Sequence, residues 1–432
     1  MFIRESLGVI QTLIRQYASR EDIEKRQLRE IQKLIARSVK HVPYYKEYYQ
    51  YLPPVESLAD LSQYPVIRKS MVREHGVEQF LNPAIKARGK IEFQTSGSTG
   101  EPLTVFHDKA CFDYSNAGGV RRAFATRSFF PTYRLFHIRT KPFLRGTRFV
   151  EYLHLFRRRN VNAALPVDEI KKLTLKERPE GIIAYPVHMR DLVASMGKDE
   201  IREVRTFLKV IFTESELLSD HHRNYIRDNL GADVFDEYSA YETLSISYEC
   251  HCHRNHVVED RLLVEIVDEN EQPVMNGQEG DIVITCFMER AMPLIRYKIG
   301  DRGILARERC PCGRSFKTLT LTDGRTNDYI VLPNGFKVRS VQILQAVEKL
   351  QKVRECYLYQ KMNGDIHFYY VPLDKNLGDE KEMKQEIVSV FSTYTPLKDI
   401  EITRSDHIPR TRGGKAQLIY SEIARGKTDV RS

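Results

Sequence analysis

Residues 181–185 read GIIAY and precede HMRDLVASM at residues 188–196; residues 208–213 read LKVIFT and precede HHRNYIRDNL at residues 221–230. Each short apolar run predicts a buried strand, and each segment after it has the apolar spacing of a helix. A strand followed by a helix, repeated along the chain, is typical of an α/β body with a largely parallel sheet.

The sequence on either side of this core extends the same body. KIEFQ (residues 90–94), PLTVF (102–106) and RLFHIR (134–139) predict further strands that alternate with helical segments. Residues 1–50 predict amphipathic helices packed on the body. Residues 261–285 contain two β-rich runs around a loop rich in Asn, Gln, Pro and Gly, which predicts an antiparallel, barrel-like portion.

A different organisation begins near Asp323. GRTNDYIVLPNGFKVRS at residues 324–340 predicts a turn, a strand, an Asn-Gly hairpin and a second strand, and later segments alternate between strand and helix. We therefore expect a large multi-subdomain N-terminal domain over residues 1–324 and a small α+β C-terminal domain over residues 325–432. The fold class is α/β and α+β.

Composition limits the classes of partner. The 432 residues have 41% hydrophobic residues and a formal charge of +9, which favours anionic partners such as nucleotides, coenzyme A, nucleic acid or an acidic membrane face. Charged residues interrupt every apolar run before the roughly 20 residues needed to span a bilayer. The amphipathic N-terminal helix predicts core packing, with peripheral membrane contact as the alternative. Seven cysteines, an odd number, favour a reducing compartment, so we expect a cytoplasmic protein.

The most informative segment for chemistry is TSGSTGEP at residues 95–102, directly after a predicted strand. Glycines let the backbone approach phosphate oxygens and hydroxyls add donors, so the segment suits a polyphosphate. It lacks the lysine of a Walker-type loop. A flexible surface loop is the alternative that composition alone leaves open. The predicted nucleotide contacts are Thr95, Ser96, Gly97, Ser98, Thr99 and Gly100.

Further segments follow in order: DEYSAYET at residues 236–243, PLIRYKIGD at 293–301, GRTND at 324–328 and PRTRGGK at 409–415. Together with residues 95–102 they resemble the motifs of the adenylate-forming superfamily, on its phenylacetate–coenzyme A ligase-like branch with the CapK-like capsule-biosynthesis proteins. The resemblance covers most of the chain and is loose before about residue 60. It implies a mobile C-terminal domain.

The resemblance also implies roles for individual residues. A carboxylate is a hard oxygen ligand suited to Mg²⁺ between phosphates, which is the role implied for Glu242. Ser239 stands where the family usually has Gly, and Tyr241 where it often has Thr or Ser. Besides the loop at 95–100, the implied ATP contacts are Glu237, Tyr238, Ser239, Asp301 at the ribose, Arg325 and the adenylation lysine Lys415; the catalytic set is Lys415, Glu242 and Arg325; and the hinge is Asn327.

The activity that the resemblance implies is that of an ATP-dependent, AMP-forming ligase. It would convert a carboxylic acid into an acyl-adenylate and transfer the acyl group to coenzyme A. Tyr185, Pro186 and Ser215 are expected near the acid, although none of them reports its identity. An amide ligase acting on an amine of a sugar or amino acid, in surface-polysaccharide or secondary-metabolite biosynthesis, shares every nucleotide motif. A homodimer is compatible with either reading.

The cysteines and histidines form a separate group. Cys250-His251-Cys252 with His256, and Cys310-Pro311-Cys312, provide two ligand pairs distant in sequence, which suits a structural zinc site. Some relatives on the branch carry zinc near this place, which favours Cys250 or Cys252 together with His256, Cys310 and Cys312. A zinc-containing nucleic-acid-binding protein is the alternative from another class. It leaves the ordered nucleotide motifs unexplained, so we expect no nucleic-acid partner.

Overall fold

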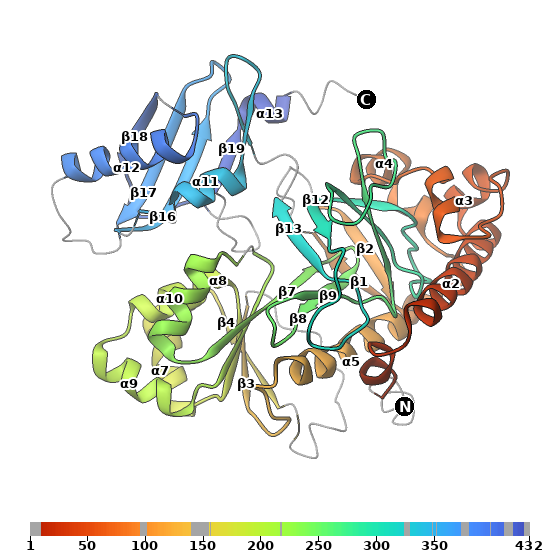
Figure 1. Cartoon of the computed structure of the whole chain (residues 1–432), viewed down its shortest axis with the longest axis horizontal. Helices are drawn as coiled ribbons and strands as arrows, with labels where there is room; N and C mark the ends of the chain where they lie inside the picture. The colour runs from red at the N-terminus through yellow and green to blue at the C-terminus, as the bar shows by residue number, and fades with distance from the viewer. Residues whose placement is uncertain are drawn as a thin grey trace. The chain divides into compact units, whose positions relative to one another are not determined.

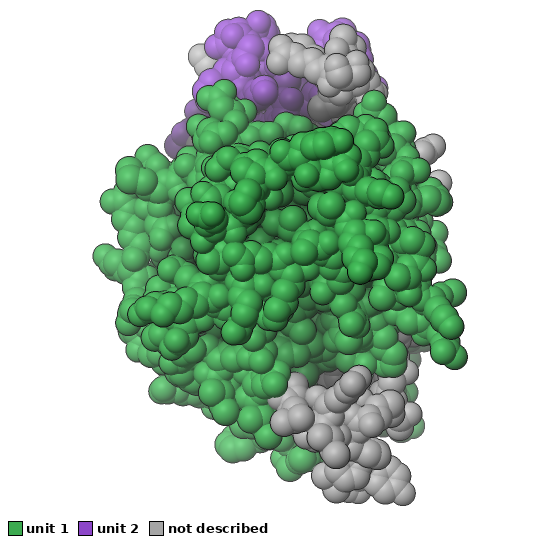
Figure 2. All heavy atoms as spheres, turned by 90° about the vertical axis from the view of Figure 1, so that its right-hand side faces the viewer, with its two compact units in different colours: residues 1–95, 102–299, 303–320 green, residues 96–101, 300–302, 321–432 purple. Residues whose placement is uncertain are grey.

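The structure is a computed structural model that describes residues 10–95, 102–139, 155, 157–216, 218–323, 329–347, 349–350, 352–372, 380–397, 399–409 and 418–426. The chain divides into two compact units (Figure 2). Unit 1 comprises residues 1–95, 102–299 and 303–320, and unit 2 comprises residues 96–101, 300–302 and 321–432. The expected domain boundary between residues 324 and 325 lies outside the described residues and stays a prediction.

The sheet predicted from the strand–helix pattern is the centre of unit 1. Strands β3 to β7 pair in parallel, and β8 and β9 continue the sheet in antiparallel pairing. The expectation of a largely parallel sheet is therefore confirmed. In the order β4-β3-β5-β6-β7-β8-β9, the strands are β4 (Arg158–Asn162), β3 (Leu135–Arg139), β5 (Gly181–Ala184), β6 (Val210–Glu214), β7 (Asp233–Ala240), β8 (Leu244–Glu249) and β9 (Asn255–Val257).

Helices cover both faces of this sheet (Figure 1). Successive residues of a strand point to opposite faces. Ile182 and Ile211 therefore pack with one set of helices, while the next residues along the strands, Ile183 and Phe212, pack with Ala123 of the other helix. The first face is covered by α7 (Val167–Glu177), α8 (Pro186–Ala194), α9 (Lys198–Phe207) and α10 (Asp220–Leu230), and the second by α5 (Lys109–Thr126).

The runs KIEFQ and PLTVF differ from the expectation. They form β1 (Lys90–Gln94) and β2 (Thr104–Asp108), which pair with each other in antiparallel fashion outside the large sheet. Only nine residues of sequence separate the two strands, and a parallel pair needs a longer crossover. The antiparallel pairing expected over residues 261–285 is confirmed, since β10 (Leu263–Val267) pairs with β11 (Glu279–Thr285). These two strands share a sheet with β12 (Tyr297–Leu305) and β13 (Leu319–Asp323).

The N-terminal helices pack on unit 1 as predicted. The first long helix is α2 (Arg20–His41), and Ser19 caps it by accepting a hydrogen bond from the backbone of Asp22. Gln27, which is fully buried, donates to the carbonyl groups of Glu259 and Leu262. Among the described residues no helix combines the length and apolar character needed to cross a bilayer. The remaining short helices are α3 (Pro43–Tyr48), η1 (Leu58–Gln63), α4 (Lys69–His75), η2 (Val77–Phe80) and η3 (Ala87–Gly89).

Arg296 joins this N-terminal segment to the strands that follow it in the fold. Its side chain is 1% exposed, and its guanidinium donates to the carbonyl groups of Ser62, Tyr64 and Glu271 over 3.2, 2.7 and 3.1 Å. Its Nε lies 3.2 Å from the carboxylate of Glu265. A planar group with five donors can satisfy all of these acceptors at once.

Unit 2 is a small α+β fold built on a sheet in the order β18-β17-β16-β19. Its core lies between one face of this sheet and two helices, with Phe368, Ile387 and Phe391 fully buried. The predicted Asn-Gly hairpin is formed by β14 and β15. The elements are β14 (Tyr329–Val331), β15 (Lys337–Arg339), α11 (Ser340–Val347), β16 (Val353–Gln360), β17 (Ile366–Pro372), α12 (Glu380–Tyr394), β18 (Ile400–Arg404), β19 (Ile419–Ser421) and α13 (Glu422–Gly426).

Candidate active site and metal cluster

The stem of the predicted phosphate loop is closed by Thr95 and Leu103. The backbone N–H of Thr95 donates to the carbonyl of Leu103 over 2.9 Å, and the N–H of Leu103 donates to the Thr95 hydroxyl over 2.9 Å. Two hydrogen bonds therefore fix both ends of the segment between them. Ser96, Gly97, Ser98, Thr99 and Gly100 lie outside the described residues, and their contacts with phosphate stay predictions.

Lys69, at the start of α4, brings Thr95 and Glu242 together. Its ammonium donates to the Thr95 hydroxyl over 2.9 Å and lies 3.9 Å from the carboxylate of Glu242. The same Glu242 oxygen accepts a hydrogen bond of 3.4 Å from Tyr297. The Glu242 side chain is 11% exposed, so it is reachable by an ion. Two residues from separate motifs thus lie around one lysine that the sequence analysis missed.

The other predicted residues of the Glu242 motif lie on β7. Glu237 forms an ion pair with Arg122 of α5, whose guanidinium lies 4.8 Å from the ring centre of Phe212. Tyr238 is buried at 8% exposure, and Ser239 lies at an irregularity where β7 pairs with β8. The structure therefore places all three side chains on the strand that leads to Glu242.

The carboxyl ends of the parallel strands form the edge where ligands bind in open α/β sheets. The strand order reverses at β3, because β4 lies on one side of it and β5 on the other. His137 of β3 contacts the carboxylate of Glu214, at the end of β6, over 3.0 Å. Burial opposes ionisation of Glu214, but His137, Arg139 and Arg122 outweigh it and hold the pKa of the carboxyl group below its ordinary value. This edge is strongly polar.

The three predicted substrate residues lie at this same edge. Tyr185 follows β5 directly, and burial raises the pKa of its phenol to about 12. Pro186 is the first residue of α8, where its missing N–H costs no hydrogen bond. Ser215 follows β6 and has a positive φ of 71°, which a non-glycine residue adopts at a local cost. Their proximity to the acid stays a prediction.

Four other predicted residues belong to unit 2 or to its undescribed segments. Asp301 lies within β12 and is grouped with unit 2. Arg325, Asn327 and Lys415 lie outside the described residues. Their roles at the ribose, the hinge and the acyl phosphate therefore remain predictions from the sequence.

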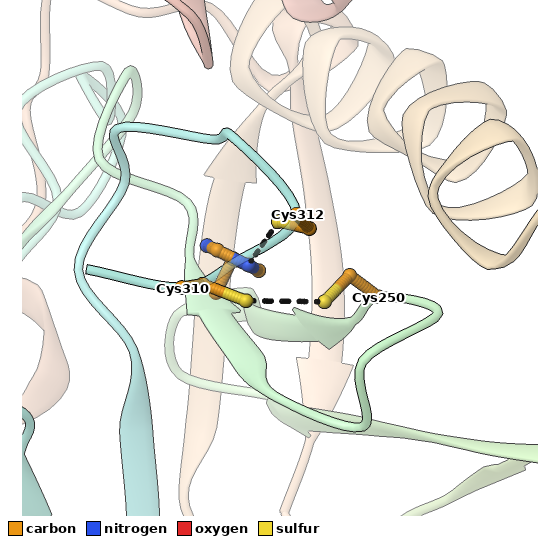
Figure 3. Close-up of side chains that lie close together, drawn as sticks. Cys250, Cys310 and Cys312 are labelled. Carbon is orange, nitrogen blue, oxygen red and sulfur yellow. Dashed lines mark hydrogen bonds between the residues drawn. The ribbon is translucent and has the colours of Figure 1, made fainter. Parts of the chain in front are cut away.

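The predicted cysteine and histidine ligands converge in unit 1 (Figure 3). One ligand atom from each of Cys250, His256, Cys310 and Cys312 lies within 4.8 Å of all the others. The sulfur atoms of Cys250 and Cys310 are 3.7 Å apart, and the Cys312 sulfur lies 3.2 Å from Nε2 of His256. Cys252 is not part of this group. Three thiols and one imidazole at this spacing fit a tetrahedral zinc ion.

The surroundings of the cluster favour the metal-binding forms of His256 and Cys312. Nδ1 of His256 donates to the carbonyl of Phe316 over 2.9 Å, which leaves the lone pair of Nε2 toward the sulfur atoms. Burial lowers the pKa of His256 to about 4, so the ring is neutral at neutral pH. Burial opposes ionisation of Cys312, but hydrogen bonds with Arg314 outweigh it and lower the pKa of that thiol. These two effects favour the forms that bind a cation, whereas burial raises the pKa of the Cys250 and Cys310 thiols.

Comparisons with known proteins find relatives that cover most of the chain. No protein-family model matches the chain. A phenylacetate–coenzyme A ligase of Thermus thermophilus is 25% identical over 405 residues, which are 90% of this chain and 87% of that protein. Protein CapK of Staphylococcus aureus is 24% identical over 389 residues, which are 85% of this chain and 81% of that protein.

A solved structure has the same fold along nearly the whole chain. A 2-hydroxyisobutyryl-CoA ligase, crystallised in a postadenylation state with an acyl-AMP, matches with a TM-score of 0.78 and 18% identity over 96% of this chain and 93% of that one. Along most of its length this chain is similar to the phenylacetate–coenzyme A ligase-like branch of the adenylate-forming superfamily. Of the superfamily motifs, the structure describes residues 236–243 and 293–301 in full.

Proposed function

We propose that this chain is an acyl-CoA ligase of the adenylate-forming superfamily. A carboxylic acid and ATP give an acyl-adenylate and pyrophosphate; coenzyme A then takes the acyl group as a thioester and AMP leaves. The carboxylate oxygen forms a bond to the α-phosphorus, and the bond from that phosphorus to pyrophosphate breaks. In the second step the thiol sulfur replaces AMP at the acyl carbon and loses its proton.

The convergence of Thr95, Lys69 and Glu242 carries the proposal. A hydroxyl at the base of a glycine-rich loop, an ammonium group and a partly buried carboxylate meet within 3.9 Å of Lys69. This set suits a triphosphate together with a divalent cation. Relatives that align over 90% and 85% of the chain include a ligase of this type and CapK.

The chain's own residues contribute positioning and charge. Transfer at the α-phosphorus needs an in-line approach and neutralisation of the oxygens, and the protein adds little covalent chemistry. Glu242 would hold Mg²⁺, which supplies positive charge between the phosphates. Lys69 adds a cation at the base of the loop, and Lys415 is assigned to the charge between the acyl carboxylate and the α-phosphate. Asp301 is assigned to the ribose hydroxyls, whose two donors a carboxylate can accept together.

We assign a structural zinc ion to Cys250, His256, Cys310 and Cys312. Four protein ligands leave no open position for a reacting water, so the ion would be structural. All seven cysteines are free thiols, which agrees with a reducing compartment and with our placement of the protein in the cytoplasm.

Acid-dependent ATP–pyrophosphate exchange tests the first step. A panel of aromatic, fatty, hydroxy and amino acids is offered to the full chain, with Lys415→Ala and Glu242→Gln as variants. Lys352→Ala, which changes a partly exposed lysine of unit 2, is the matched control. We expect the native protein to catalyse exchange with a narrow class of acids. The exchange rate should fall about a hundredfold or more in both variants and stay unchanged in the control. A folded native protein that exchanges with no acid and binds no ATP would contradict the proposal.

The acceptor is tested with the acid found in that panel. Incubation with ATP and either coenzyme A or a set of amino sugars and amino acids is followed by mass spectrometry of the products. A thioester formed at a much higher kcat/KM than any amide supports the ligase. An amide formed faster than the thioester would reassign the second step while leaving the first intact.

A further inference from the structure

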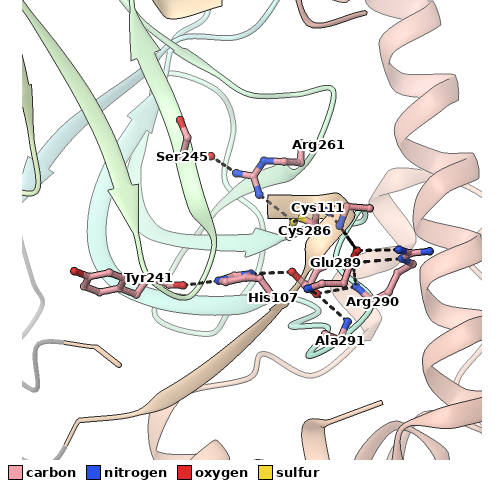
Figure 4. Close-up of polar contacts among 11 residues, drawn as sticks. His107, Cys111, Tyr241, Ser245, Arg261, Cys286, Glu289, Arg290 and Ala291 are labelled. Atoms are coloured by element: carbon pink, nitrogen blue, oxygen red, sulfur yellow. Dashed lines mark hydrogen bonds and ion pairs between the residues drawn. The ribbon is translucent and has the colours of Figure 1, made fainter. Parts of the chain in front are cut away.

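The turn that carries Glu242 is held by two buried side chains, His107 and Arg261 (Figure 4). Residues 241–243 connect β7 to β8. The carbonyl group of Tyr241 in this turn and that of Ser245, the second residue of β8, each meet one of these side chains. Nε2 of His107 lies 2.7 Å from the carbonyl oxygen of Tyr241, and the guanidinium of Arg261 donates to the carbonyl oxygen of Ser245. His107 is 2% exposed and Arg261 is 0% exposed.

The direction of the His107 hydrogen bond follows from the chemistry of its partners. A backbone carbonyl only accepts, so Nε2 must carry a proton. Nδ1 of His107 lies 2.8 Å from one oxygen of Glu289. The other Glu289 oxygen accepts from the backbone N–H groups of Asp108, Arg290 and Ala291 over 2.8, 2.9 and 2.8 Å.

Three backbone donors stabilise the charged form of a carboxylate. Glu289 is therefore the anion, and its free oxygen accepts from a second proton on Nδ1 of His107. Burial opposes the charge on His107, but the hydrogen bond and charge of Glu289 outweigh it and raise the pKa of the imidazole. Since a charged donor makes the stronger hydrogen bond, His107 holds the Tyr241 carbonyl tightly.

One short segment after β11 supplies the partners of both cations. Glu289 binds His107, and three residues before it the Cys286 sulfur accepts from Arg261 over 3.2 Å. The ring of Tyr241 is also fixed, since it stacks on Phe93 at 5.8 Å. Leu244, the first residue after the turn, has a positive φ of 60°. A turn with a non-glycine residue in this conformation persists where its surroundings determine it.

We propose that His107, anchored by Glu289, is a positioning residue that fixes the Tyr241 carbonyl and thereby holds the Glu242 carboxylate in place for its cation. The role of Glu242 in this statement rests on the proposed function. The hydrogen bond to Tyr241 and the order of the turn do not depend on the proposed function. His107 also lies on β2, the strand that follows the predicted phosphate loop in sequence, so one side chain links the two motifs.

Two substitutions separate positioning from simple packing. The amide nitrogen of Gln takes the place of Nε2, so His107→Gln keeps a donor to Tyr241 and loses the one to Glu289. The amide nitrogen of Asn takes the place of Nδ1, so His107→Asn keeps the donor to Glu289 and loses the one to Tyr241. Each variant deletes one hydrogen bond, and only one of them releases the turn.

Hydrogen–deuterium exchange of the peptide covering residues 241–247 is measured without ATP or acid. We expect exchange about tenfold faster in His107→Asn, and within about twofold of the native rate in His107→Gln, since one such hydrogen bond corresponds to about a decade in an equilibrium constant. His367→Asn makes the same substitution at a buried histidine of unit 2, which pairs with Glu401 over 3.0 Å; it is the matched control and should leave this peptide unchanged. Equal acceleration in both His107 variants, or none in a folded His107→Asn, overturns the proposal.

The functional consequence is measured separately as the Mg²⁺ activation constant of ATP–pyrophosphate exchange. We expect it to rise about tenfold in His107→Asn and much less in His107→Gln. A native protein without any ATP–pyrophosphate exchange would overturn the proposed function and the role of Glu242. The hydrogen–deuterium exchange result would still decide whether His107 holds the Tyr241 carbonyl. Should His107→Asn fail to fold, ¹⁵N-histidine spectra of the native protein decide, with His107→Gln assigning the signal: a deprotonated Nε2 at pH 7 overturns the proposal.

Discussion

The ammonium group of Lys69 lies 3.9 Å from the carboxylate of Glu242. The same ammonium donates to the hydroxyl of Thr95, so one cation touches both groups that we assign to the phosphates and their metal. A positive charge in this position favours the binding of a polyanion more than it favours a later step.

Replacing Lys69 by Met is therefore expected to raise the KM for ATP by about tenfold or more with a smaller change in kcat, because the lost interaction is with the bound nucleotide. Steady-state ATP–pyrophosphate exchange measures both constants. Lys171→Met is the matched control, since Lys171 pairs with Glu200 over 3.4 Å, is also partly buried and lies in none of the nucleotide motifs. An unchanged KM in the Lys69 variant would remove this residue from the ATP site.

Removal of a single cluster thiol is expected to release the zinc. Cys310→Ser should lower the metal content from about one ion per chain to near zero and lower the Tm, because a serine hydroxyl is a poor zinc ligand. Inductively coupled plasma mass spectrometry and thermal unfolding measure the two effects. Cys252→Ser changes a neighbouring cysteine outside the group and should keep the ion. Equal zinc in both variants would contradict the assignment.

A buried carboxyl group makes stability depend on pH. Burial raises the pKa of Asp236 to about 7, while an unfolded aspartate titrates near 4. The folded state thus holds a proton that the unfolded state loses between about pH 4 and 7, and stability falls as the pH rises through this range. Asp236→Asn removes this proton. The difference in the free energy of unfolding, variant minus native, should therefore rise by roughly 2–4 kcal/mol as the pH goes from 5 to 8.

Unfolding followed at several pH values checks the Asp236 prediction. The exposed Asp233 at the start of the same strand supplies the control variant, Asp233→Asn, for which the difference from the native protein should stay flat. A flat difference for Asp236→Asn as well would mean that this carboxyl group is ionised in the folded protein throughout the range.

Loss of the Arg296 guanidinium is expected to destabilise unit 1. In Arg296→Lys a single ammonium cannot serve Glu265 and three carbonyl groups, and the unpaired buried groups should cost about 3–5 kcal/mol. Arg68→Lys is the matched control, because Arg68 pairs with Glu271 at the surface and its change should cost less than about 1 kcal/mol. Chemical unfolding measures both. Similar losses would show that burial of Arg296 is not what matters.

The strands and helices of both units were largely predictable, because apolar runs such as GIIAY and LKVIFT are long enough to show their period. Which strand pairs with which was not predictable. KIEFQ has the pattern of any other strand. It pairs with β2, where the chain comes back beside it at Leu103, and not with the large sheet. An apolar run indicates burial on a sheet without indicating which sheet.

The candidate site was predictable where a motif names its residues and not where contacts cross the sequence. Nothing in the sequence distinguishes Lys69 from other lysines, and His107 and Glu289 are 182 positions apart. The C-x-C pattern does not distinguish Cys250 from Cys252. In the fold, Cys250 belongs to the cluster and Cys252 does not. The positive φ of 52° at His253 shows how sharply the chain turns there.

The contacts of α2 and α3 also bear on how the chain is made. Gln27 reaches its partner Glu259 across 232 positions, and Tyr45 donates to Pro293 across 248. During synthesis the first helices therefore leave the ribosome long before the strands that cover them exist. A fragment ending before residue 259 would expose the apolar side of α2, so nascent chains of this protein should depend on chaperones until that point is passed.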